Sequence, residues 1–194
     1  MSGVVGMIIA VMGKSGSGKS DLCAFLQGKG FYHIEADQIS RHIMQEGSPV
    51  LGEVRRAFGD EFFEDGTLLR KKLGQLVFAD RESLDVLNQI TGKAVYEAIC
   101  KEMERHQGRD IAIDAFLLPE RLLDLCDIRI AVTADDVVRV QRIMHRDGLS
   151  IEDAKNRLSS QQEPEADIIL VNNGDKENFL KLVEEVYEKI RSYY

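Results

Sequence analysis

The sequence lacks the patterns that identify several common classes of protein. Its three cysteines, Cys23, Cys100 and Cys126, are odd in number and widely spaced, which argues against a disulfide framework and fits a reducing, cytoplasmic compartment. The four histidines show no metal-ligand spacing and no CxxC pair occurs, so we do not expect a structural zinc site.

A net positive charge and long apolar segments are also lacking. With a formal net charge of −8, the chain has no general basic face for nucleic acid, although one local site on an acidic protein can still be basic. The apolar run VVGMIIAVM, residues 4–12, is too short to span a membrane and is followed at once by glycine and lysine. We therefore expect small-molecule partners, no nucleic acid and no membrane, and a monomer or small homo-oligomer.

What the sequence does contain is a regular alternation of strand-like and helical patterns. Its 194 residues suit one domain, and continuous apolar runs separated by helices are typical of a parallel sheet covered on both faces. The runs that predict buried strands are residues 6–12, 31–35, 110–115, 127–134 and 167–172. We therefore predict an α/β fold with a five-stranded parallel sheet, in a single domain over residues 1–194.

The gap between the second and third predicted strands, about residues 37–109, reads as helical. Apolar residues recur there at three- and four-residue spacing, which predicts a helical insert over one edge of the sheet. Gly92 could kink or break the longest of these helices. Farther along, Ser150 and Asp153 are spaced as a capping box, and residues 177–194 predict an amphipathic closing helix.

A glycine-rich segment directly follows the first predicted strand. It reads GKSGSGKS and matches the pattern G-x-x-x-x-G-K-[ST], in which backbone N–H groups and a helix N-terminus surround an anion. Lys19 can reach the outer phosphates of a nucleotide, and the Ser20 hydroxyl can ligate magnesium. A plain glycine- and serine-rich loop is the alternative. The residues predicted to bind ATP here are Gly13, Gly16, Ser17, Gly18, Lys19, Ser20 and Asp21.

Asp21 is the one awkward residue of this segment, because its carboxylate adds a negative charge next to the predicted phosphate site. If the side chain points away, it is harmless and favours the helix N-terminus. If it points inward, it weakens nucleotide binding.

Beyond the loop, the pattern resembles the dephospho-CoA kinase family over nearly the whole chain. The segments that carry the resemblance are EADQISR (35–41), the run from EGSPV to VFAD (46–80), RIMHRDGLSIEDAKNRLSSQ (142–161) and ADIILVNNGD (166–175). The resemblance implies a P-loop NTPase-type three-layer sandwich. Its parts would be a core of residues 1–36, 110–134 and 165–194, an acceptor-binding insert at about 37–109 and a lid at about 135–164.

Members of this family use ATP and Mg²⁺ to phosphorylate the ribose 3′-hydroxyl of dephospho-CoA, which is the last step of coenzyme A biosynthesis. The resemblance makes Asp37 the base or hydrogen-bond acceptor for the attacking hydroxyl and a further candidate ligand of magnesium; a helix N-cap is the alternative. Asp114, at the end of the third predicted strand, resembles the acid that binds magnesium through water. Capping of the next helix is its alternative role.

Arg139, Arg142 and Arg146 recur at a spacing of three and four and therefore share one helix face. Such a face can neutralise phosphates in the transition state, or it can simply be solvated. We assign Arg142 to catalysis together with Lys19, assign Arg142 and Arg146 to ATP binding, and leave Arg139 undecided.

The remaining candidates come from the resemblance alone. Asn173 would lie beside the adenine, although Asn-Asn-Gly also suits a tight turn. The predicted acceptor-binding residues are Asp37, Arg41, Arg70 and Leu117.

The acceptor side also departs from the family pattern. Thr91–Gly92 stands where the family usually has His-Pro, and Phe116 stands where it usually has Pro. Two alternatives therefore stay open: another P-loop small-molecule kinase, such as a nucleoside monophosphate kinase, and a nucleotide-binding regulator without catalysis.

Overall fold

The computed structural model describes residues 6–116, 118–159 and 164–193, and it divides the chain into two compact units. The first unit consists of Met1–Glu35 and His106–Tyr194, so it combines the two ends of the chain. The second unit is Ala36–Arg105, which contains most of the segment predicted as helical.

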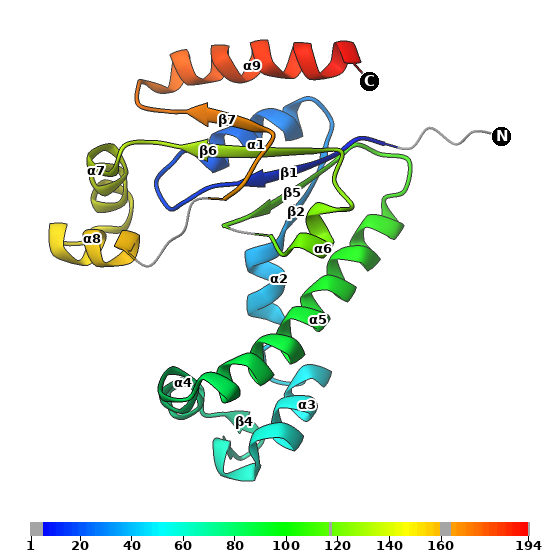
Figure 1. Cartoon of the computed structure of the whole chain (residues 1–194), viewed down its shortest axis with the longest axis vertical. Helices are drawn as coiled ribbons and strands as arrows, with labels where there is room; N and C mark the ends of the chain where they lie inside the picture. Colours follow the sequence, from blue (N-terminus) through cyan, green and yellow to red (C-terminus); the bar gives the residue numbers. More distant parts are fainter. Residues whose placement is uncertain (1–5, 117, 160–163, 194) are drawn as a thin grey trace. The chain divides into compact units, whose positions relative to one another are not determined.

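A parallel sheet with the strand order β2-β5-β1-β6-β7 forms the centre of the first unit (Figure 1). Its strands are β1 (Ile8–Met12), β2 (Tyr32–Glu35), β5 (Ile111–Ala115), β6 (Ile128–Thr133) and β7 (Ile168–Val171). All five predicted strands are thus confirmed, each slightly shorter than predicted. Ile9 and Val11 of the central strand β1 are completely buried, as expected for a parallel sheet covered on both faces.

The helices of the first unit pack on this sheet or on one another. The helices of the first unit in its described part are α1 (Lys19–Gly28), α6 (Glu120–Leu123), α7 (Asp136–Asp147), α8 (Ile151–Ser159) and α9 (Lys176–Tyr193). Leu26 of α1 and Val183 of α9 belong to one buried cluster with the sheet, which confirms the amphipathic closing helix. Before α8, Ser150 Oγ accepts from the N–H of Asp153 at 3.1 Å, which confirms the first bond of the predicted capping box. The Asp153 carboxylate reaches back to Ser150 as well, but it accepts from the hydroxyl at 2.6 Å.

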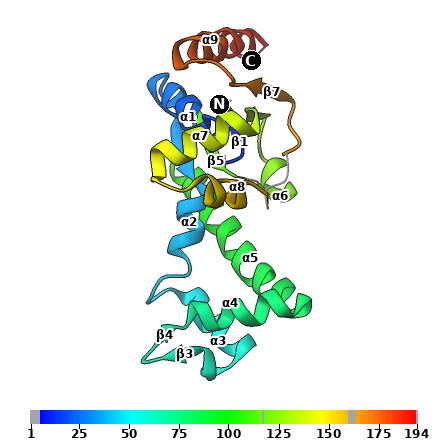
Figure 2. The ribbon, with the colours of Figure 1, turned by 90° about the vertical axis from the view of Figure 1, so that its left-hand side faces the viewer.

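The second unit, all of whose residues are described, is mainly helical, as predicted. Its elements are α2 (Ala36–His42), α3 (Pro49–Phe58), the 3₁₀ helix η1 (Asp60–Phe62), β3 (Phe63–Glu64), β4 (Thr67–Leu68), α4 (Arg70–Ala79) and α5 (Arg81–Arg105) (Figure 2). The sequence pattern did not predict the β3–β4 hairpin. Asp65 and Gly66 form its turn with φ angles of 47° and 85°, the left-handed conformations that a two-residue hairpin turn favours.

Helix α5 runs without interruption through Gly92, the position where the sequence allowed a break. The hydroxyl of Thr91 donates to the carbonyl of Leu87 at 2.8 Å, one helical turn earlier. The pair Thr91–Gly92 is therefore accommodated inside a regular helix of 25 residues. Neither α5 nor any other helix of the described chain has both the length and the apolar character needed to cross a membrane.

Candidate active site

The glycine-rich loop joins the carboxyl end of the central strand β1 to the first turn of α1. Parallel sheets bind ligands beyond the carboxyl ends of their strands. β1 lies between β5 and β6: the connection after β1 leads to β2 on one side of it, and the connection after β6 leads to β7 on the other side. Gly18 caps α1 in the left-handed conformation, with φ 100°. A Cβ atom at Gly18 would lie 2.1 Å from Asn172 Nδ2. Both the backbone angle and this close approach require glycine at the position.

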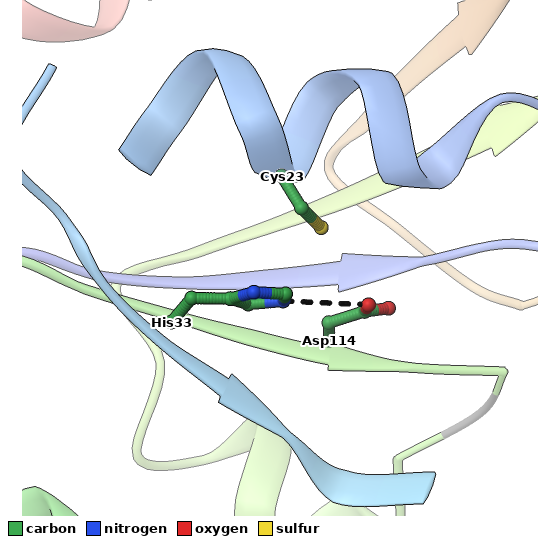
Figure 3. A group of neighbouring side chains, drawn as sticks. All are labelled: Cys23, His33 and Asp114. Atoms are coloured by element: carbon green, nitrogen blue, oxygen red, sulfur yellow. Dashed lines mark ion pairs between the residues drawn. The ribbon is translucent and has the colours of Figure 1, made fainter. Parts of the chain in front are cut away.

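Lys19 and Asp114 form an ion pair beside the loop. Asp114 lies on β5, whose register places it next to both Val11 of β1 and Glu35 of β2, so it is at the ligand-binding edge of the sheet. His33 Nε2 lies 3.4 Å from the other carboxylate oxygen of Asp114 (Figure 3). Burial alone would raise the pKa of Asp114, but the contact with His33 and the charge of Lys19 outweigh it and hold this pKa below its usual value.

Three further residues of the predicted phosphate site have distinct surroundings. Ser20 is exposed on the first turn of α1, where its hydroxyl is accessible to a ligand. Ser17 is fully buried, and its hydroxyl has no hydrogen-bond partner among the described residues. Asp21 forms an ion pair with Lys176 at 2.7 Å, and its backbone N–H donates to the carbonyl of Gly18 at 3.0 Å. Its carboxylate is therefore paired with a positive charge at the start of α9, which offsets the negative charge beside the predicted phosphate site.

Arg142 connects the glycine-rich loop to the loop that follows β7. Its guanidinium donates to the carbonyls of Gly16 at 3.3 Å and Ser17 at 3.4 Å. It also donates to Asn172 Oδ1 at 3.2 Å and to the carbonyl of Gly174 at 3.1 Å. Arg142 thus lies next to the predicted ATP site, where it holds the backbone of the glycine-rich loop.

The other two arginines of α7 have different surroundings despite their regular spacing. Arg139 is 3% exposed and pairs with Asp136 through Nη2, while its Nε and Nη1 atoms have no hydrogen-bond partner in the described chain. Its backbone also lies against Gly16 of the loop. Arg146 is exposed and donates to the carboxylate of Asp147 at 2.7 and 2.8 Å, and this pairing raises the pKa of Arg146. Of the three arginines, Arg139 and Arg142 are therefore adjacent to the loop, whereas Arg146 is engaged by its neighbour.

The two asparagines after β7 also differ. Asn173 is exposed, and its side-chain oxygen accepts from the N–H of Asp135 at 2.8 Å, which links this loop to the start of α7. Asn172 is 3% exposed and donates from Nδ2 to the carbonyl of Ser17 at 2.9 Å. The prediction named Asn173 and missed Asn172, since the sequence does not reveal that Asn172 packs against Gly18.

The predicted acceptor residues belong to the second unit or lie outside the described residues. Asp37 is exposed in the first turn of α2, and its carbonyl accepts from Arg41 Nε at 3.1 Å. Arg70 donates to the carbonyl of Met44 at 2.7 Å. Leu117 is outside the part of the chain that the structure describes. Only Ala36 separates Asp37 from the end of β2 in the sequence.

Comparisons with known proteins point to a single family. A family model described as dephospho-CoA kinase matches residues 7–178. A dephospho-CoA kinase from Corynebacterium glutamicum is 35% identical over 192 residues, and one from Shouchella clausii is 31% identical over 193 residues; both alignments cover 94% of this chain and 98% of the relative.

Solved structures agree with this result. The dephospho-CoA kinase from Campylobacter jejuni is 25% identical with a TM-score of 0.64, over 94% of this chain and 96% of that one. A protein from Thermus thermophilus is 26% identical with a TM-score of 0.75, over 95% of this chain and 98% of that one.

Proposed function

Because the chain belongs to the dephospho-CoA kinase family, we propose that it transfers the γ-phosphoryl group of ATP to the ribose 3′-hydroxyl of dephospho-CoA. The products are CoA and ADP, and the reaction is the last step of coenzyme A biosynthesis. The observation that carries this proposal is the geometry of the loop before α1, where left-handed Gly18 and the adjacent Lys19 suit a nucleotide's terminal phosphates. The three free cysteines support a cytoplasmic location.

ATP binding requires Lys19 to exchange partners. In the structure its ammonium group pairs with Asp114, and an incoming triphosphate offers a stronger concentration of negative charge at the helix N-terminus. The Ser20 hydroxyl and the Asp114 carboxylate are oxygen donors of the kind that Mg²⁺ prefers, so the donor set fits this ion. When bound, Mg²⁺ neutralises charge on the β- and γ-phosphates. Asp37 is a further candidate for its coordination shell.

Asp37 is the proposed acceptor of the proton from the 3′-hydroxyl. As that proton leaves, the ribose oxygen forms a bond to the γ-phosphorus, and the bond between the γ-phosphorus and the bridging oxygen of ADP breaks. Asp37 is exposed on the first turn of α2, two residues after Glu35 at the end of β2. Glu35 is paired in the sheet with Asp114 of β5. Arg41, Arg70 and Leu117 remain proposed acceptor contacts.

Two arginines are proposed to stabilise the charge that develops during transfer. Arg139 has two guanidinium nitrogens without partners in the described chain, and these are donors of suitable charge for phosphate oxygens. Arg142 holds the loop in place and adds positive charge beside it. Arg146 and Asn173 remain proposed ATP contacts, and Arg146 would have to leave Asp147 to make one.

The direct test is to mix the protein with ATP, Mg²⁺ and dephospho-CoA and to look by mass spectrometry for a product heavier by one phosphate. The product should co-elute with authentic CoA, because phosphorylation at another hydroxyl gives an isomer of the same mass. ADP release with a nucleoside monophosphate in place of dephospho-CoA would instead support the alternative kinase. Nucleotide binding without ADP release over any acceptor would support the regulator. Lys19→Met is the matched control, which should remove turnover with either acceptor.

A further inference from the structure

Three side chains from separate elements of the first unit lie close together between helix α1 and the sheet. Cys23 lies on α1, His33 on β2 and Asp114 on β5, and Figure 3 shows all three side chains directed toward one another. Their sulfur, nitrogen and carboxylate oxygen atoms all lie within 4.8 Å of one another. Cys23 is 1% exposed, and the Nε2 atom of His33 is buried without a hydrogen bond of ordinary geometry in the described chain.

The separations in this cluster are close to those of a tetrahedral metal site. Two ligand atoms that each lie about 2.1 Å from a tetrahedral ion are about 3.4 Å apart, because the edge of the tetrahedron is about 1.6 times its radius. The observed distance from His33 Nε2 to Asp114 Oδ2 is 3.4 Å. The Cys23 sulfur lies within 4.8 Å of the other two ligand atoms, and metal–sulfur bonds of about 2.3 Å would place it about 3.6 Å from each of them in an occupied site.

The donor set also selects among cations. A thiolate, an imidazole and a carboxylate together suit Zn²⁺ and its tetrahedral analogue Co²⁺, whereas Mg²⁺ takes oxygen donors. We propose that Cys23, His33 and Asp114 form a binding site for a zinc-like divalent cation, with water as the fourth ligand. On binding, the thiol proton of Cys23 passes to solvent and the sulfur bonds to the cation.

Occupancy of this site changes the partner of Asp114. The carboxylate that pairs with Lys19 becomes a metal ligand, and the ammonium group of Lys19 is repelled by the new cation. Asp114 is then no longer available beside the phosphates. Zinc should therefore inhibit phosphoryl transfer. This consequence rests on the proposed function, whereas the binding of the metal is independent of that function.

Co²⁺ titration of the full chain without nucleotide tests the site directly. We expect one Co²⁺ per chain and the near-ultraviolet charge-transfer absorption of a cobalt–thiolate bond. Cys23→Ala should remove this absorption and weaken binding at least roughly 100-fold, since even residues that only support metal ligands contribute about 10–100-fold. Cys100→Ala and Cys126→Ala are matched controls, and they should leave the absorption and the affinity for Co²⁺ unchanged. His33→Ala should weaken binding as well, and it keeps the thiol, so it serves if Cys23→Ala does not fold.

Two results would overturn the site: a wild-type chain without cobalt–thiolate absorption, or folded Cys23→Ala that binds Co²⁺ as wild type does. In a kinase assay, Zn²⁺ should inhibit wild type at concentrations that leave Cys23→Ala active. Equal inhibition of both proteins would refute the effect on Asp114. If no kinase activity is found at all, the proposed function fails while the absorption still decides the metal site.

Discussion

Replacement of the two neighbouring asparagines after β7 should have very different effects. Asn172→Ala removes the hydrogen bond from Nδ2 to the carbonyl of Ser17 at 2.9 Å and the bond that Oδ1 accepts from Arg142 at 3.2 Å. A neutral buried hydrogen bond contributes about 1 kcal/mol and one to a charged group about 1.5–3 kcal/mol. Because Arg142 keeps its other acceptors, we expect Asn172→Ala to lower the free energy of unfolding by about 2–3 kcal/mol.

The matched control is Asn173→Ala, which loses only one exposed hydrogen bond to the N–H of Asp135. That change should lower the free energy of unfolding by about 0.5–1 kcal/mol. For a chain of this length, Tm should fall by roughly 4–12 °C in Asn172→Ala and by about 1–4 °C in Asn173→Ala. ATP affinity should fall roughly tenfold in Asn172→Ala, because the loop loses its preorganisation, and by less in Asn173→Ala, which leaves the loop in place. The assays are calorimetry on the free protein and ATP titration, and equal effects of the two variants would refute the reasoning.

Three further predictions follow from the site. Asp37→Asn should lower kcat by about 10²–10⁴-fold in a steady-state assay and leave ATP affinity nearly unchanged; full turnover would exclude its role as proton acceptor. Arg139→Met should lower kcat/KM for ATP by about 10²–10⁴-fold, because two charge-assisted bonds to phosphate are lost. Arg146→Met should have a smaller effect, because Arg146 must leave Asp147 before it can contact ATP, and equal effects would contradict this ranking. The pKa of Asp114 is lower in the folded chain than in the unfolded chain, so its stabilisation is present above about pH 4 and is lost as pH falls through the folded value. Urea denaturation across the acid range should show this loss in wild type and not in Asp114→Asn.

The parts of the fold that the sequence predicted are those that depend on local patterns. Each strand was recognisable because it is a short apolar run between helical segments, and the glycines of the loop before α1 were recognisable by their spacing. The hairpin of β3 and β4 was missed because each strand has only two residues, too few to show alternation. Asp65–Gly66 is the sequence signal for this turn, but it lies within a segment whose spacing otherwise predicts helix.

The parts of the site that were missed depend on which elements pack together. Arg139, Arg142 and Arg146 are equivalent by spacing, yet one is buried, one holds the loop and one pairs with its neighbour. Periodicity identifies the face of a helix but not what covers each turn of it. Cys23 and His33 likewise have no metal-ligand spacing in the sequence, and only the packing of α1 on β2 and β5 brings them together.

The ion pair between Lys19 and Asp114 also determines which form of nucleotide the protein should prefer. A bare triphosphate satisfies the ammonium group but takes away the ion-pair partner of the partly buried Asp114 carboxylate. A nucleotide that arrives already complexed with a divalent cation supplies an opposite charge to each member of the pair. If the proposed function is correct, we expect both members of the pair to exchange partners at once, so that uncomplexed nucleotide binds more weakly than the metal complex.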